Sequence, residues 1–323
     1  MNQIFKLPKQ KIPVTIITGF LGSGKTTLLN YILSNRQNLK VAVLVNEFGD
    51  INIDSQLLIS IDEEMILLSN GCICCTINAS LIDAVNKVIE ARDIDCIIIE
   101  TTGLAEPIPL IMTFASSCLR EVTRLDGILT VIDAENFNPN NLDSKIALDQ
   151  LIYGDIIVLN KIDLVSAVKL QQIEEFIRTV KIDVKIIHCE YGVVPLPFIL
   201  DVEMSNLKKL TSSSLKHNID SSSNHYLQAE NFMSVSFQSD KPLNIEKFSR
   251  FLDDKLPKTV FRGKGIIWYQ GSKRRHIFQL SGKRCNFQSD EWIDSPSNQL
   301  VFIGRNLDAE KIKSQLEECL VMI

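Results

Sequence analysis

The stretch "GFLGSGKTT", residues 19–27, decides the fold of this chain. It follows a short apolar run and opens a helical pattern, which is the context that a P-loop requires. Its glycines let the backbone wrap closely, so that consecutive N–H groups and the helix N-terminus face phosphate oxygens. A glycine-rich turn before an ordinary helix rarely carries Gly-Lys-Thr-Thr at this offset. The residues expected to contact phosphate are Gly19, Gly22, Ser23, Gly24, Lys25, Thr26 and Thr27.

Around this loop, residues 14–200 alternate short β-branched runs with helical patterns. The apolar runs are nearly continuous, which is typical of strands covered on both faces, and the segments between them suit right-handed crossovers. The expected fold is therefore α/β, a P-loop NTPase domain with a mostly parallel sheet sandwiched by helices. The apolar runs occupy residues 14–20, 40–47, 96–101, 127–134, 155–161 and 184–189.

The pattern changes near residue 200. Residues 211–230 are rich in Ser and Asn with few apolar residues, which is typical of a linker. We expect a P-loop domain over 1–205, a linker over 206–229 and a smaller α+β domain over 230–323. Strands of an antiparallel or mixed sheet and a closing amphipathic helix are expected at 232–238, 265–271, 275–282, 299–304 and 307–320.

Composition excludes several classes of protein. With 323 residues, 45% hydrophobic and 23% charged, the chain is long enough to bury a core and is not expected to be disordered. No apolar run approaches the ~18 residues of a membrane span, and residues 1–13 lack the apolar segment of a secretory signal. A cytoplasmic protein with reduced cysteines is therefore expected. Of the eight cysteines, four are expected to pack as small hydrophobic residues, and the role of Cys285 is left open; the four are Cys96, Cys118, Cys189 and Cys319.

The segment "NKID", residues 160–163, indicates which base is bound, because it ends a later strand and loops gather at the carboxyl edge of a parallel sheet. Asp163 can accept hydrogen bonds from both N1–H and the exocyclic amine of guanine, whereas adenine offers an acceptor at N1. Asn160 and Lys161 would brace the loop and cover the base. GTP is therefore the expected nucleotide.

A third polar segment, "ETTGLAEP" at residues 100–107, ends another apolar strand. Glu100 suits a magnesium shell together with Thr26, while Lys25 bridges the outer phosphates. Gly103 lets the backbone swing toward a γ-phosphate, as in the switch segments of GTPases. Leu104 stands where Ras-like enzymes place the glutamine that orients water, so unassisted hydrolysis is expected to be slow.

Between the two segments that would sense the third phosphate lies "SNGCICCTIN", residues 69–78, which clusters three thiols. In an extended segment Cys72 and Cys74 face the same side, and Cys75 completes the shell if the backbone bends. Thiolates favour zinc and cuprous copper, and three of them leave one tetrahedral position open for exchange. Buried packing, a redox pair and a structural zinc site are the competing interpretations.

Taken together, "GFLGSGKTTLLN", "NEFGD", "NGCICC", "ETTGLAEP" and "NKIDL", in this order, resemble the CobW family of SIMIBI-class P-loop GTPases. Segments at 264–271, 275–282 and 299–308 look like the family's C-terminal domain. The family includes zinc-transferring metallochaperones. The resemblance implies GTP hydrolysis coupled to metal delivery, with Cys72, Cys74 and Cys75 handling the metal.

Four residues are left open by the resemblance. Glu47 and Asp50 fit a switch or an additional metal ligand as well as a solvated turn. Many relatives carry a histidine-rich stretch, whereas the four histidines here are scattered, and only His217 and His225 share one segment.

The expected function is a GTP-dependent metallochaperone carrying zinc, or another transition metal such as cobalt, to a client metalloprotein. A regulatory GTPase that senses metal or oxidants without transferring anything is the main alternative. From Lys255 to Arg284 the chain has nine Lys or Arg and no Asp or Glu. This basic run favours a docking surface for a protein, and nucleic-acid binding with Trp268 and Tyr269 as stacking platforms is the further alternative.

Overall fold

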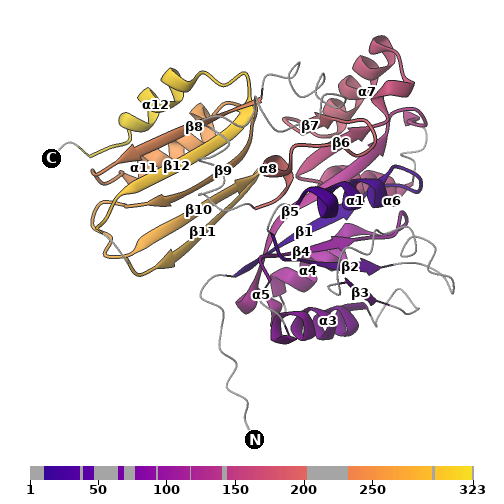
Figure 1. Ribbon diagram of the computed structural model, residues 1–323. Coiled ribbons are helices and arrows are strands. Elements are labelled where there is room, and N and C mark those ends of the chain that lie inside the picture. Colours follow the sequence, from indigo (N-terminus) through magenta and orange to yellow (C-terminus); the bar gives the residue numbers. More distant parts are fainter. Residues whose placement is uncertain are drawn as a thin grey trace, which may run out of the picture. The chain divides into compact units, whose positions relative to one another are not determined.

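The computed structural model describes residues 11–36, 39–46, 65–68, 77–91, 94–116, 118–139, 144–201, 232–292 and 295–321 (Figure 1). The chain divides into two compact units, Met1–Asp201 and Val202–Ile323. Several sequence predictions lie outside the described residues: the linker 206–229 and the roles of Glu47, Asp50, Cys72, Cys74, Cys75, His217 and His225.

The first unit is built on a seven-stranded parallel sheet in the order β3-β2-β4-β1-β5-β6-β7. Every residue of β1, β4 and β6 is buried, as expected for strands covered on both faces. The α/β fold predicted from the sequence is confirmed. The strands are β1 Ile12–Thr18, β2 Val41–Asn46, β3 Met65–Leu68, β4 Cys96–Glu100, β5 Thr123–Asp133, β6 Ile156–Asn160 and β7 Lys185–His188.

Helices lie on both sides of this sheet (Figure 1). The core between the sheet and α3, α4 and α5 contains apolar side chains of β1, β2 and β4, and a second cluster packs α6 and α7 against β6 and β7. The helices are α1 Lys25–Asn35, α3 Ile77–Ala91, α4 Pro107–Ser116, α5 Leu119–Val122, α6 Lys145–Tyr153, η2 Ile162–Leu164, α7 Ala167–Val180 and α8 Leu196–Ile199. None of the helices in the described ranges combines the length and apolarity that a membrane span requires.

The second unit is a five-stranded antiparallel sheet in the order β11-β10-β9-β12-β8, packed against three helical segments. Phe248 and Phe278 meet edge to face in its core, with ring centroids 5.8 Å apart. Tyr269 is also part of this core, so its ring is not an exposed stacking platform for nucleic acid. The elements are β8 Phe232–Ser239, α11 Ile245–Arg250, η4 Phe251–Lys255, β9 Val260–Ile267, β10 Arg275–Ser281, β11 Arg284–Asp290, β12 Asn298–Arg305 and α12 Ala309–Glu317.

Several details differ from the sequence expectations. Strands β3 and β11 were not expected, and β9 begins at Val260 rather than at residue 265. Cys118, immediately before the short helix α5, is exposed, whereas Cys96, Cys189 and Cys319 are buried as expected.

Candidate functional site

The P-loop connects β1 to α1 at the carboxyl edge of the sheet. Gly19 has φ +137°, and a Cβ there would lie 2.1 Å from Val131 O. Gly24 has φ +98°, and a Cβ there would lie 2.2 Å from Asn160 Nδ2. Both positions therefore require glycine, since a side chain would be strained by the backbone angle and would also collide with Val131 of β5 or with Asn160 at the end of β6.

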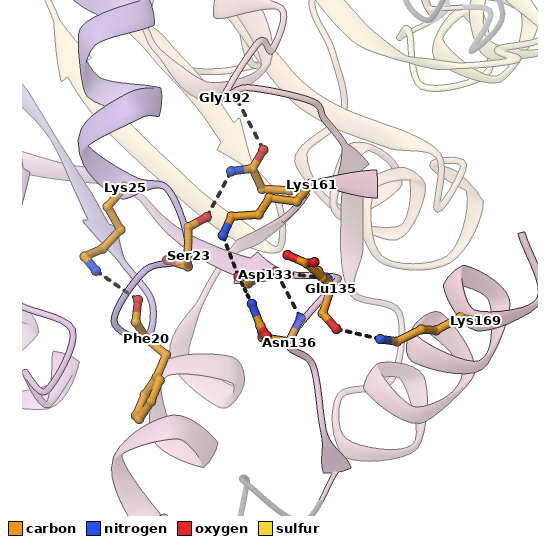
Figure 2. Close-up of polar contacts among 10 residues, drawn as sticks. Phe20, Ser23, Lys25, Asp133, Glu135, Asn136, Lys161, Lys169 and Gly192 are labelled. Carbon is orange, nitrogen blue, oxygen red and sulfur yellow. Dashed lines mark hydrogen bonds and ion pairs between the residues drawn. The ribbon is translucent and has the colours of Figure 1, made fainter. Parts of the chain in front are cut away.

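Inside this loop, two polar side chains are held away from solvent. Lys25 is 8% exposed, and its Nζ donates across the loop to Phe20 O at 3.0 Å (Figure 2). Ser23 is 1% exposed, and its Oγ has no hydrogen-bond partner among the described residues. A buried ammonium, an unpartnered hydroxyl and a helix N-terminus together fit an anion with several oxygens, such as phosphate.

Thr26 and Glu100 meet although they are far apart in the sequence. Thr26 Oγ1 donates to Glu100 Oε1 at 2.8 Å, and Glu100 is 3% exposed. The contact forms because β4, which ends at Glu100, is the parallel neighbour of β1, which leads into the P-loop. A hydroxyl and a carboxylate are hard oxygen donors, so this pair fits Mg²⁺ better than it fits a soft metal.

The segment after β4 packs against the P-loop. Thr101 N donates to Ile17 O at 3.0 Å, and a Cβ on Gly103 would lie 2.6 Å from Leu21 N. Gly103 is buried, whereas Leu104 points outward and is 47% exposed. The backbone of Gly103 therefore lies directly beside the phosphate-binding loop.

Asn160 connects three loops at this edge and is 2% exposed. Its Nδ2 donates to Ser23 O at 2.9 Å, while its Oδ1 accepts from Gly192 N at 3.2 Å and Cys189 Sγ at 3.1 Å. Gly192 in turn has φ +71° and lies against the backbone of α1, where a Cβ would come within 2.7 Å of Leu28 N. Asn160 thus fixes the segment 160–163 relative to the P-loop.

Lys161 extends from the same segment toward the end of β5. Its Nζ donates to Asp133 Oδ2 at 2.7 Å, and Asn136 contributes backbone and side-chain N–H groups to the same carboxylate (Figure 2). Burial raises the pKa of Asp133, but the hydrogen bonds from Asn136 and Lys161 outweigh it, so the pKa lies below its ordinary value. Asp163 lies on η2 and is exposed, where its carboxylate is accessible to a ligand.

The structure therefore brings the P-loop, Glu100, Gly103 and the 160–163 segment together along one edge of the sheet. Sequence reasoning missed Asp133, Gln150, Cys189 and Gly192. An aspartate directly after the apolar run of β5 was a usable signal for Asp133, but Gln150 lies in the middle of α6 and carries no local signal.

Within the described ranges, no group of three or more His, Cys, Asp or Glu side chains could hold a metal ion. The thiol cluster of residues 72–75 lies outside those ranges, in the connection between β3, which ends at Leu68, and α3, which begins at Ile77.

Comparison with known proteins relates both units to one family. The model of the CobW/HypB/UreG nucleotide-binding domain matches residues 13–188, and that of the cobalamin synthesis protein cobW C-terminal domain matches residues 232–320.

Individual relatives match along nearly the whole chain. Zinc-regulated GTPase metalloprotein activator 1 of Dictyostelium discoideum is 32% identical over 384 residues, covering 97% of this chain and 80% of the relative. The zinc chaperone YjiA of Escherichia coli (strain K12) is 31% identical over 320 residues, covering 94% and 97%. Zinc-regulated GTPase metalloprotein activator 1 of Schizosaccharomyces pombe is 33% identical over 346 residues, covering 92% and 83%.

Proposed function

This chain belongs to the CobW/HypB/UreG family, and from that premise we propose that it is a GTP-hydrolysing metallochaperone. It takes up a transition metal, with zinc as the strongest candidate, and delivers it to a client metalloprotein. The similarity to proteins named zinc chaperone and zinc-regulated GTPase metalloprotein activator supports this function. The observation that supports the proposal is that the segments expected to bind phosphate, magnesium and the base meet through the contacts Thr26–Glu100 and Asn160–Ser23.

In this function the P-loop from Gly19 to Thr27 binds the phosphates of GTP. Lys25 exchanges its contact with Phe20 O for the outer phosphate oxygens, and the Ser23 hydroxyl gains the partner that it lacks among the described residues. Thr26 and Glu100 hold magnesium, which, when bound, supplies positive charge against the negative charge that develops on the phosphates.

The base is read by the segment that Asn160 and Lys161 fix in place. Lys161 has φ +61° and is tied to Asp133, which directs the following turn outward. Asp163 on that turn accepts from two guanine N–H groups and selects GTP over ATP.

Hydrolysis is slow without a partner. Gly103 contacts the third phosphate through its backbone, and Leu104 beside it is an exposed hydrocarbon side chain that cannot orient water. A partner that supplies a water-orienting group, such as the client itself, accelerates the reaction.

The metal cargo binds at Cys72, Cys74 and Cys75. In chain order this trio follows β3, whose carboxyl end lies at the same edge of the parallel sheet as the P-loop. GTP draws the adjacent segments inward and completes the thiolate site, and hydrolysis to GDP loosens it. The basic run of the second unit offers a docking surface for the client.

A release experiment tests this cycle. Protein loaded with zinc and GTP is mixed with a fluorescent zinc chelator, and phosphate and transferred zinc are followed in the same sample. Zinc is expected to appear with phosphate for GTP and to remain bound with a non-hydrolysable analogue. Hydrolysis without zinc release would favour a regulatory GTPase that senses metal. Glu100→Gln is the matched control, since it should stop phosphate and zinc release together.

A further inference from the structure

The side chain of Gln150 is a buried polar group that the proposed reaction does not use. It lies on α6 and is 2% exposed. Its Nε2 lies 3.2 Å from Gly103 O and 3.1 Å from Ala105 O, so the two hydrogens of one amide reach two carbonyls. Because both partners are acceptors, the NH2 end of the amide must face this loop.

The loop that Gln150 holds lies between α6 and the P-loop. On the P-loop side, Gly103 approaches so closely that a Cβ would lie 2.6 Å from Leu21 N. The loop also closes on itself through a hydrogen bond of 3.1 Å from Ala105 N to Thr102 O. The position that Gln150 secures is therefore the inward one, with the backbone of Gly103 beside the P-loop.

Gln150 is itself fixed to the central sheet. Thr130 Oγ1 donates to Gln150 O at 2.6 Å, and Thr130 is 2% exposed on β5. The same strand ends at Asp133, which binds Lys161 of the base-reading segment. The side chain of Gln150 is thus anchored to β5, the same strand that holds Lys161 through Asp133.

We propose that Gln150 is a positioning residue that favours the GTP-bound over the GDP-bound protein by holding the carbonyls of Gly103 and Ala105. This inference rests on the proposed GTPase function. Only GTP carries the third phosphate that the inward loop contacts, so the hydrogen bonds of Gln150 contribute to GTP affinity and not to GDP affinity. Without these hydrogen bonds, the loop that contains Gly103 moves away from the P-loop, and its contact with the third phosphate must form again when GTP binds.

The test compares nucleotide affinities of the full-length protein. Gln150→Met keeps the length of the side chain and removes both hydrogen bonds. Calorimetric titration with GDP and with a non-hydrolysable GTP analogue is expected to show unchanged GDP affinity. The preference for the GTP analogue should fall about tenfold, the scale of one to two ordinary hydrogen bonds.

Two controls separate positioning from general stability. Thr123→Val removes a buried hydrogen bond from Thr123 Oγ1 to Leu119 O at the start of β5, away from the nucleotide site, so it should lower the melting temperature without changing the nucleotide preference. Gln171→Met, on the exposed face of α7, should change neither. If Gln150→Met does not fold, Gln150→Asn, which keeps the amide but shortens the arm, should show the same loss of preference.

Equal loss of affinity for both nucleotides, or no loss, would overturn the role of Gln150 while leaving the GTPase proposal intact. A wild-type protein that binds neither nucleotide would instead overturn the proposed function itself.

Discussion

Replacing Asn160 with alanine should loosen the nucleotide site before any nucleotide binds. The side chain is 2% exposed and makes three contacts, with Ser23 O, Gly192 N and Cys189 Sγ. The substitution removes all three and leaves a buried carbonyl and a buried N–H without these partners.

The expected cost follows from these contacts. An unsatisfied buried polar group costs about 1–3 kcal/mol, and a thiol is a weak donor that adds little. Water entering the space recovers part of the loss, so the first unit should lose about 2–4 kcal/mol of unfolding free energy. The matched control is Asn35→Ala, which removes an exposed contact to Tyr31 O and should cost less than about 0.5 kcal/mol.

The assay has to report on the first unit alone. Both tryptophans of the chain, Trp268 and Trp292, belong to the second unit, so their fluorescence follows only that unit. Hydrogen exchange of peptides covering residues 19–27 and 160–164, with and without urea, reports on the nucleotide unit. Asn160→Ala should speed exchange in these peptides and leave the tryptophan transition unchanged.

Two results would refute this reasoning. Unchanged exchange together with greatly weakened nucleotide binding would mean that Asn160 acts on the ligand and does not connect the loops. A shifted tryptophan transition would mean that the effect is not confined to the first unit.

Four further substitutions test other parts of the first unit. Gly24→Ala should abolish GTP binding measured by calorimetry, because its Cβ would lie 2.2 Å from the side-chain amide nitrogen of Asn160. The Cβ of Gly22→Ala would meet nothing within 4 Å, so this substitution should cost only ~1–2 kcal/mol of backbone strain, measured by urea unfolding. Asp163→Ala should weaken GTP binding about a hundredfold and leave weak ATP binding unchanged, as measured by competition binding. Equal losses of GTP and ATP affinity would contradict this. The hydrogen bond from His188 is the main reason that the pKa of Glu174 lies below 4.5. The stabilisation is therefore present above that value and is lost as pH falls through the lowered pKa of Glu174. His188→Ala should lower the unfolding free energy at about pH 5.5 and lower it progressively less in stronger acid. A difference in unfolding free energy between the variant and the wild type that stays constant across pH would contradict this.

The central part of the fold could be predicted because short, local sequence patterns indicate its strands and its P-loop. The apolar runs of β1, β4 and β6 are continuous, and the P-loop has a fixed spacing of residue types. The beginning of β5 was missed, because its first residues include Arg124 and Asp126, which resemble a loop in sequence. In the structure these charges are buried and form an ion pair, with Asp201 as a further partner of Arg124.

Other features depend on contacts between distant residues. The strand β3 has four residues, too few for a periodic pattern, and it exists through pairing with β2. The strand β11 is mostly polar, as is typical of an edge strand, and among the described strands it pairs with β10 alone. Gln150 and Cys189 gain their roles solely from loops that fold back onto them.

The central claim is that the loops that sense the third phosphate also set the affinity for metal. Competition titration of zinc against a chelator, with the protein saturated by GDP and then by a non-hydrolysable GTP analogue, tests it most directly. We predict tighter binding of one zinc ion in the GTP state, and loss of that difference when Cys72, Cys74 and Cys75 are all changed to serine. Equal zinc affinity in the two nucleotide states, or a difference that persists in the triple serine variant, would contradict the account.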